Sequence, residues 1–278
     1  MKVTNRVLQF ISFRIIGRRR TRQMLLRLFQ ALDFDMLQVA HTVIGVNNYG
    51  NNTETGEDFF IKKYLHKKFT NEPITIFDVG ANVGKYSLLL HEVFPFAKVY
   101  AFEPNPVAYK TLLEKVTSIK NITPFCVGLG PGLSKMEIYT YKNDKASEHA
   151  SVIRDVMVDL HHSDDVENYR VDIIDLDSFC NNNSIKKIHF LKIDTEGYEL
   201  EVLKGAANFI KHNLIEVIQF EFNEMNIFSK SFLKDFYALL PNYSFYRLCK
   251  DKLIPLGEYN SSNEIFRYQN IIGLLSSN

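Results

Sequence analysis

Gly80, Asn82 and Gly84 follow a short apolar run that contains Asp78, and a helical pattern begins directly after them. A second apolar run, further along the chain, ends in Glu103. Glycines let a ligand approach the backbone closely, and an acid at the end of a second strand can accept hydrogen bonds from both hydroxyls of a ribose. The two motifs together predict a site for a cofactor that contains a nucleoside.

The glycine pattern distinguishes between two kinds of cofactor. A dinucleotide requires Gly-x-Gly-x-x-Gly, because its pyrophosphate lies on exposed N–H groups at the start of a helix. Asn82 occupies the second of these positions and Lys85 follows Gly84, so the fingerprint is absent. S-adenosylmethionine carries adenosine but no phosphate, and Asp78 and Asn82 suit its methionyl ammonium and carboxylate. We therefore expect S-adenosylmethionine, and the alternative is a tight turn without a ligand.

A second turn with two carboxylates lies further along the chain. A buried-type strand, 188–193, is followed by Asp194 and Glu196, and a helical pattern then runs toward Gly205. Another apolar run contains Glu221 near its end. Ligands of open α/β sheets bind beyond the carboxyl ends of the strands, so these acids are expected in the same crevice as the glycine turn.

The sequence resembles the FkbM-type S-adenosylmethionine-dependent methyltransferases from roughly Gly56 to the C-terminus. The matching blocks have the order and spacing of that family. They are Asp78-Val-Gly-Ala-Asn-Val-Gly-Lys-Tyr-Ser87, Phe102-Glu-Pro-Asn-Pro106, Leu191-Lys-Ile-Asp-Thr-Glu-Gly-Tyr-Glu-Leu-Glu-Val-Leu-Lys-Gly-Ala206 and Ile218-Gln-Phe-Glu221. The resemblance implies a set of cofactor-binding residues, among which Asp194 lies near the transferable methyl group. The set is Asp78, Gly80, Asn82, Gly84, Tyr86, Ser87, Glu103 and Asp194.

The resemblance and the alternation of apolar runs with helical patterns predict an α/β fold. We expect the class I methyltransferase (Rossmann-like) architecture, a doubly wound sheet of about seven strands whose last strand is antiparallel. Residues 1–50 are expected to form a basic helical N-terminal arm, and residues 51–278 the S-adenosylmethionine-dependent methyltransferase domain.

Individual elements follow from periodicity and from turn and cap residues. The expected strands are 74–79, 98–102, 122–126, 135–141, 170–174, 188–193, 216–222, 244–249 and 269–274. The expected helices are 58–69, 85–93, one that begins at Pro106 after the cap Asn105, 200–212 and 230–240. A polar loop is expected at 49–57, and an irregular polar insertion at 142–169 with His149, His161 and His162.

Methyl transfer to a hydroxyl group requires a base, because a sugar hydroxyl is a weak nucleophile. Asp194 is the first candidate and Glu221 the second, and Glu196 and the histidines of the insertion remain open. Burial and a nearby like charge can raise the pKa of a carboxyl toward the value that this role needs. Glu196 could instead stabilise a helix N-terminus. These carboxylates could also bind Mg²⁺, but their spacing does not demand a metal, and none is predicted.

The first 32 residues carry eight lysines and arginines and no acid, so this arm has a charge of +8 and the remainder −7. Apolar residues recur at helical spacing on both sides of Gly17, which predicts two amphipathic helices. Such helices can lie on an anionic membrane surface. The favoured alternative is a helical cap that packs on the catalytic domain or on a second subunit of a homo-oligomer, because charge runs are usually solvated faces. Nucleic acid binding is disfavoured, because the arm contains few aromatic residues.

Composition indicates a globular enzyme with one main domain: 278 residues, 46% hydrophobic and 23% charged. Three cysteines without any Cys-x-x-Cys pair indicate neither a zinc site nor a disulfide framework. The apolar stretch 7–13 is too short for a secretory signal, and no run reaches membrane-spanning length. A cytoplasmic location is expected, with contact at the inner membrane surface as an option for the arm.

Three functions are compatible with the sequence. The leading hypothesis is O-methylation of a sugar hydroxyl in a glycan, glycolipid or glycosylated metabolite, because the resemblance points to such acceptors. The second is O-methylation of a polyketide or another small natural product. The third is a non-catalytic or nucleic-acid-associated protein, which the basic arm alone favours.

Overall fold

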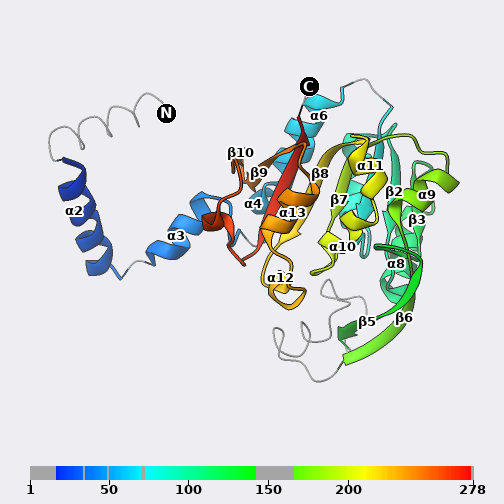
Figure 1. Ribbon diagram of the computed structural model, residues 1–278, viewed down its shortest axis with the longest axis horizontal. Helices are drawn as coiled ribbons and strands as arrows, with labels where there is room; N and C mark the ends of the chain where they lie inside the picture. The colour runs from blue at the N-terminus through cyan, green and yellow to red at the C-terminus, as the bar shows by residue number, and fades with distance from the viewer. Residues whose placement is uncertain (1–16, 34, 49, 71–72, 142–165, 277–278) are drawn as a thin grey trace. The chain divides into compact units, whose positions relative to one another are not determined.

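The computed structural model of the protein describes residues 17–276 except 34, 49, 71–72 and 142–165 (Figure 1). The chain divides into two compact units, residues 1–43 and 44–278. Residues 44–50, which the sequence assigned to the arm, group with the larger unit.

The smaller unit contains helices α2 (Arg18–Ala31) and α3 (Met36–Val43). The amphipathic helix predicted after Gly17 is confirmed as α2. The helix predicted before Gly17 lies outside the described residues. No described helix combines the length and apolar composition needed to cross a membrane.

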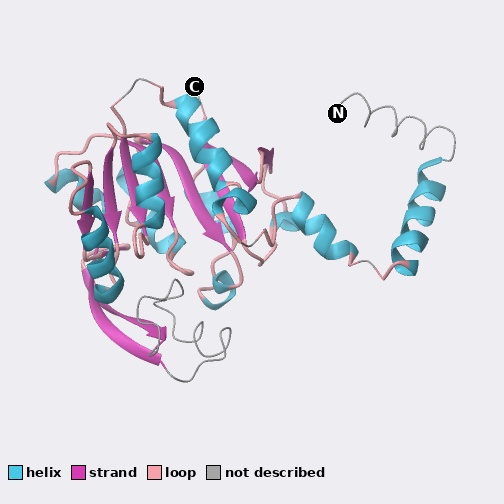
Figure 2. Cartoon of the chain, turned by 180° about the vertical axis from the view of Figure 1, so that it is seen from behind, coloured by secondary structure: helices cyan, strands magenta, loops and turns pink. Residues whose placement is uncertain are grey.

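The larger unit is built on a sheet to which eight described strands contribute (Figures 1 and 2). These are β1 (Thr75–Val79), β2 (Lys98–Phe102), β3 (Ile122–Phe125), β7 (Ile188–Ile193), β8 (Ile215–Phe222), β9 (Tyr243–Cys249), β10 (Lys252–Pro255) and β11 (Gln269–Leu275). Their order is β10-β9-β11-β8-β7-β1-β2-β3. Neighbours from β8 to β3 are parallel, whereas β11 is antiparallel to both β8 and β9. The predicted sheet with an antiparallel last strand is confirmed, and β10 extends it beyond the predicted set.

Helices cover both faces of the sheet, because parallel strands bury both of their faces. One core layer joins Phe179, Leu203 and Phe236 to the strands, and the other joins Leu90 and Leu112. The helices of the first layer are α9 (Leu176–Asn182), α10 (Glu199–Lys204), α11 (Ala207–Lys211) and α13 (Leu233–Leu239). Those of the second are the π-helix η2 (Phe60–Leu65), α7 (Lys85–Val93) and α8 (Pro106–Val116).

The remaining described elements are short helices that flank these layers. They are α4 (Asn52–Thr55), α5 (Glu57–Phe59), α6 (His66–Lys68), α12 (Met225–Phe228) and the 3-10 turn η4 (Ser261–Asn263). The predicted loop at 49–57 therefore contains a helical turn. The Asn51 side chain accepts hydrogen bonds from the N–H groups of Thr53 and Glu54, so a polar stretch that resembles a loop is in fact a capped helix start.

A second sheet has the order β4-β6-β5. It consists of β4 (Gly128–Leu129), β5 (Ser134–Tyr141) and β6 (Val166–Ile174). The added antiparallel strand predicted at 135–141 is confirmed as β5. The predicted irregular insertion is wrong for 166–169, because these residues pair with 138–141 and lengthen β6. The rest of the insertion, with its three histidines, lies outside the described residues.

The helix predicted at 200–212 is two helices, α10 and α11, which are separated at Gly205 and Ala206. A Cβ atom on Gly205 would lie 1.9 Å from the carbonyl oxygen of Gly130, so the chain passes against a neighbouring turn at this point. The helix predicted at 230–240 is shorter and begins at Leu233. The apolar repeat of the sequence revealed neither the break at Gly205 nor the helix start at Leu233, because such a repeat does not mark where a helix begins or ends.

Candidate active site

The glycine turn after β1 lies against the end of β2, next to Glu103. Gly80 has φ +80°, and a Cβ atom there would lie 1.7 Å from the carbonyl oxygen of Asp194. The N–H groups of Gly80 and Ala81 both donate to the carbonyl oxygen of Phe102 at the end of β2. Asn82 is also left-handed, with φ +47°, a conformation that asparagine tolerates better than most residues. The turn therefore lies tightly between β2 and the turn after β7.

Two adjacent cavities open at the carboxyl ends of the parallel strands. The first encloses about 620 Å³ including its open mouth, and its walls include Phe102, Glu103 and Leu129. The second encloses about 1560 Å³ including its mouth, and polar side chains line it. Four residues line both cavities, which places them at the junction. They are Gly80, Asn82, Asp194 and Glu196.

Glu103 is buried at the end of β2, as the sequence predicted. Its Oε2 accepts a hydrogen bond from the N–H group of Asn82, and its Oε1 accepts one from Asn105, both at 2.7 Å. Burial raises the pKa of the carboxyl to about 7, although these two hydrogen bonds oppose the shift. A carboxylate has further lone pairs, so the two hydroxyls of a ribose in the first cavity can still donate to Glu103.

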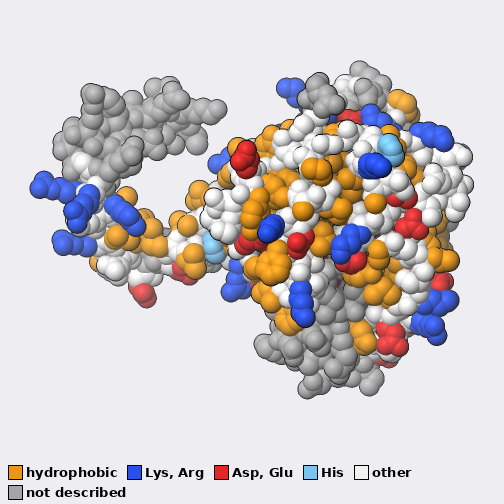
Figure 3. All heavy atoms as spheres, viewed as in Figure 1, with side chains coloured by type: hydrophobic (Ala, Val, Ile, Leu, Met, Phe, Trp, Pro, Cys, Tyr) orange, Lys and Arg blue, Asp and Glu red, His pale blue; other side chains and the backbone are white. Residues whose placement is uncertain are grey.

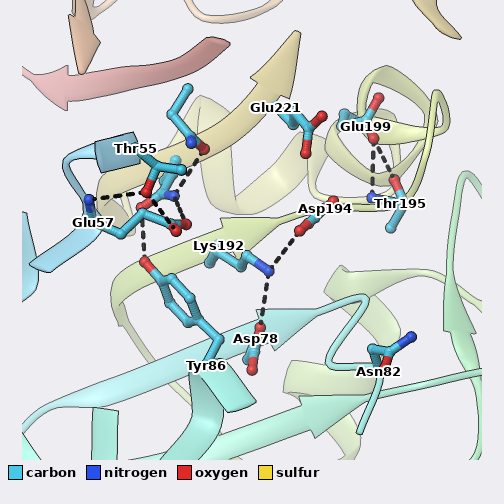
Figure 4. Close-up of polar contacts among 12 residues, drawn as sticks. Thr55, Glu57, Asp78, Asn82, Tyr86, Lys192, Asp194, Thr195, Glu199 and Glu221 are labelled. Carbon is cyan, nitrogen blue, oxygen red and sulfur yellow. Dashed lines mark hydrogen bonds and ion pairs between the residues drawn. The ribbon is translucent and has the colours of Figure 1, made fainter. Parts of the chain in front are cut away.

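A buried lysine, Lys192, lies between Asp194 and Asp78 and lines the second cavity (Figure 4). Lys192 Nζ is 3.0 Å from Asp194 Oδ2 and 3.7 Å from Asp78 Oδ1, and it lies 4.6 Å from the centre of the Tyr86 ring. Burial opposes the charged form, but the carboxylates of Asp194, Asp78 and Glu57 raise the pKa of Lys192 above its ordinary value. The charged ammonium group of Lys192 therefore orients the carboxylate of Asp194.

Asp78 and Ser87 were expected to bind the cofactor, but both are fully buried. Ser87 Oγ donates to Asp78 Oδ2 at 2.6 Å, and burial raises the pKa of Asp78 while Lys192 opposes that shift. Neither residue is among the described residues that line the two cavities. Asp78 lies next to Lys192, which lines the second cavity, and the cofactor-binding role of Asp78 and Ser87 stays a prediction. Tyr86 lines the second cavity, and Gly84 shapes the turn at φ +84°.

A second polar network, which the sequence analysis missed, lies beside Tyr86 (Figure 4). Tyr86 Oη donates to Gln219 Oε1 at 2.8 Å, and Gln219 Nε2 donates to Glu57 Oε1 and Asn270 Oδ1 at 3.1 and 2.9 Å. Thr55 Oγ1 donates to the other oxygen of Glu57. Burial raises the pKa of Glu57. One signal was available in the sequence: Gln219 stands between Ile218 and Phe220 in a mainly apolar strand, and a buried amide requires partners.

The turn after β7 is held by Glu199, which the sequence analysis also missed. Its Oε1 accepts from the N–H groups of Thr195 and Gly197 and from Thr195 Oγ1, at 3.0 to 3.1 Å. An acid in the first turn of a helix is the sequence signal for this arrangement. Glu196 has φ +55° and lines both cavities. Glu199 therefore holds the turn that leads into α10.

The three candidate bases all line the second cavity. Asp194 has a side chain that is 35% exposed, and it also lines the first cavity. Glu221 accepts a hydrogen bond from Asn223 Nδ2 at 2.5 Å. Burial, and then the charges of Asp194 and Glu196, raise the pKa of Glu221 well above its ordinary value. Among the described residues, no group of three or more His, Cys, Asp or Glu side chains is arranged to hold a metal ion.

The sheet order, the glycine turn after β1 and the acid at the end of β2 define a class I methyltransferase fold, whose cofactor is S-adenosylmethionine. The Methyltransferase FkbM domain matches residues 78–247. The chain belongs to the FkbM methyltransferase family, as the sequence resemblance implied.

Three curated relatives are named as methyltransferases. Methyltransferase 1 of Beauveria bassiana is 27% identical over 54% of this chain and 64% of the relative. Hexuronic acid methyltransferase AglP of Haloferax volcanii is 27% identical over 56% of this chain and 59% of the relative. The 31-O-demethyl-FK506 methyltransferase FkbM of Streptomyces tacrolimicus is 26% identical over 48% and 59%. The chain thus spans about three fifths of the length of these relatives.

A solved structure with a similar arrangement is the fibrillarin of Aeropyrum pernix with natively bound S-adenosyl-L-methionine. It is 11% identical, with a TM-score of 0.37 over 73% of this chain and 67% of that chain.

Proposed function

We propose that the protein is an S-adenosylmethionine-dependent O-methyltransferase that acts on a sugar hydroxyl of a glycan, glycolipid or glycosylated metabolite. One observation carries the proposal: Asp194 lies where a cavity suited to a nucleoside meets a cavity with polar walls. This arrangement suits a carboxylate that faces a methyl donor on one side and an acceptor on the other.

The residues present fit the cofactor. The apolar side chains of Phe102, Leu129 and Ile173 suit an adenine, and Glu103 suits the ribose. Because Gly80 has no Cβ atom, the glycine turn can pass directly against the carbonyl oxygen of Asp194, which brings Asp194 to the edge of the first cavity. When bound, S-adenosylmethionine supplies an electrophilic methyl group.

The protein's own contribution is to position the acceptor and remove its proton. In the proposed mechanism, Asp194 accepts the proton of the acceptor hydroxyl. Lys192 orients Asp194 through the 3.0 Å ion pair. Glu221, on the acceptor side only, is the rival base.

The lining of the second cavity favours a sugar as acceptor. A polyhydroxylated ring requires many hydrogen-bond partners, and this cavity offers carboxylates, amides, hydroxyls and an ammonium group. They belong to Asn52, Thr55, Glu57, Lys85, Glu221, Asn223, Glu224, Tyr268 and Asn270. The similarity to a hexuronic acid methyltransferase supports the same class of acceptor. The similarity to a methyltransferase of demethyl-FK506 supports the alternative, a polyketide or another small natural product.

The acceptor class can be tested with methyl-labelled S-adenosylmethionine and separated glycan, glycolipid and natural-product fractions. We expect label in a sugar-containing fraction, and after acid hydrolysis we expect it to remain on a monosaccharide. The Asp194→Asn protein, assayed in parallel, is the control for background transfer. Label that remains on the non-sugar part would support the natural-product alternative, and no transfer to any fraction would count against the proposed activity.

Cofactor binding should depend on pH through Glu103. Because the pKa of its carboxyl is about 7, the group is protonated below that pH, whereas ribose hydroxyls donate best to the ionised form. We expect affinity to be nearly constant above pH 7 and to fall by up to about tenfold per unit below it. Glu103→Gln should weaken binding by roughly 1.5 to 3 kcal/mol and flatten this profile.

Calorimetric titration of both proteins at several pH values measures this effect. Circular dichroism controls for the loss of the Glu103 hydrogen bonds to the turn. If Glu103→Gln binds S-adenosylmethionine as the wild type does, Glu103 is not a ribose ligand.

A further inference from the structure

Helix α2 carries a strong positive charge that the catalytic proposal does not use. The helix contains five arginines and no acidic residue. They are Arg18, Arg19, Arg20, Arg22 and Arg27. Figure 3 shows basic side chains gathered along this helix with apolar side chains beside them.

The same helix exposes a row of large apolar side chains. Met24, Leu25 and Leu28 within the helix, and Leu32 directly after it, are between 47% and 60% exposed. At about 100° per residue these four fall within an arc of about 100°. Exposed apolar residues of this size, gathered on one face, mark an interaction surface.

The arginines border this apolar arc on both sides. By the same geometry, Arg20 and Arg27 lie beside the Met24 edge, and Arg22 lies beside the Leu25 edge. Long basic side chains in these positions can reach anionic headgroups while the apolar face is buried in the acyl region. The helix is 14 residues long, which corresponds to about 21 Å and is shorter than the hydrocarbon core of a bilayer. It therefore suits a position in the plane of the membrane surface.

We propose that α2 binds the surface of an anionic lipid membrane. The apolar face of Met24, Leu25, Leu28 and Leu32 lies in the lipid, and the arginines lie at the headgroups. Charge complementarity selects this partner. A second copy of the helix would bring arginines against arginines, and it offers no acid to balance them. A nucleic acid would meet the arginines but would leave the apolar face without a partner. The proposal is independent of the acceptor and of methyl transfer.

Flotation of the full-length protein with vesicles tests the proposal. The vesicles are phosphatidylcholine alone and phosphatidylcholine with added phosphatidylglycerol. We expect flotation with the anionic vesicles only, and loss of flotation at high salt because the charges are screened. Arg20→Gln/Arg27→Gln should weaken partitioning roughly 25-fold, at about fivefold per arginine. Leu25→Ser/Leu28→Ser should weaken it at least tenfold.

Matched controls change exposed residues of the larger unit. Lys115→Gln/Lys120→Gln removes two exposed positive charges, and Phe96→Ser/Leu133→Ser removes two exposed apolar side chains. Both control proteins should float as the wild type does. Equal losses in the control and α2 variants would show that net charge or general hydrophobicity, rather than α2, governs binding, and would overturn the proposal.

Three further results would also overturn it. The first is no flotation at low salt, and the second is equal flotation with neutral vesicles. The third is a protein that does not float but instead binds an oligonucleotide, or that forms a dimer which the Leu25→Ser/Leu28→Ser change dissociates. Light scattering and a labelled-oligonucleotide titration measure these alternatives. None of these assays depends on enzyme activity, so failure here is distinct from failure of the proposed function.

Discussion

Replacement of Asp194 by asparagine is expected to lower the rate of methyl transfer by about 10² to 10⁴, the usual loss when a general base is removed. Asparagine keeps the shape of the side chain but cannot accept the proton. Cofactor affinity should stay within a few-fold, because Glu103 and the apolar side chains Phe102, Leu129 and Ile173, which we propose hold the adenosine, are unchanged. Turnover with saturating S-adenosylmethionine, together with calorimetric affinity, separates the two effects.

Glu221→Gln is the matched comparison, because Glu221 lines the second cavity but is not among the residues that line the first. Because its pKa is raised, the Glu221 carboxyl stays protonated to a higher pH than a glutamate in water, and a protonated carboxyl cannot act as a base. We therefore expect a smaller loss of turnover for Glu221→Gln than for Asp194→Asn. The reverse order across pH would transfer the role of base to Glu221. Loss in both proteins, with a wild-type rate that responds to Mg²⁺ or a chelator, would indicate a metal instead.

Lys192→Met is expected to reduce the free energy of unfolding by about 3 to 5 kcal/mol, the usual cost when one partner of a buried ion pair is removed and the other charge stays buried without it. Asp78 is fully buried, and among the described residues its Oδ1 is paired with Lys192. Without the ammonium, Asp78 is expected to stay protonated to a higher pH. Its raised pKa then gives stability at low pH that is lost as pH rises through that value, so the defect should grow with pH.

Denaturant unfolding of the full-length protein at several pH values measures this change. Lys187→Met is the control, because Lys187 pairs with Glu216 while its side chain remains 47% exposed, and such pairs contribute about 0 to 1 kcal/mol. The double variant Lys192→Met/Asp78→Asn should recover part of the stability, because it removes the unpaired charge. An equal, small effect of Lys192→Met and Lys187→Met would show that the buried ion pair does not support the fold.

Much of the sheet could be predicted from sequence because its strands are short apolar runs with clear limits. The predicted bounds of 98–102 and 188–193 match β2 and β7, and Asn105 caps α8 before Pro106 as expected. The length of β6 could not be predicted, because the polar residues Glu167 and Asn168 give no apolar period. Their strand conformation comes from pairing with β5.

The candidate site shows the same division. Glu103 and Asp194 could be placed from sequence, because each follows a recognisable buried strand and parallel strands end at one edge of the sheet. Glu57 could not, since it precedes β1 and reaches the site through a hydrogen bond from Gln219, a contact between residues 162 positions apart. The sequence around each residue does not indicate which distant residue it will contact.

The sequence by itself determined the order of the strands along the chain, the turn that needs glycine at position 80, and the acids at the strand ends. These depend on backbone conformation and on hydrophobic period, which are local properties. Only the tertiary structure decided which acids face the cavities and which are buried beneath them. Asp78 and Asp194 carry the same group, but packing buries the first against Lys192 and leaves the second partly exposed at the junction of the two cavities.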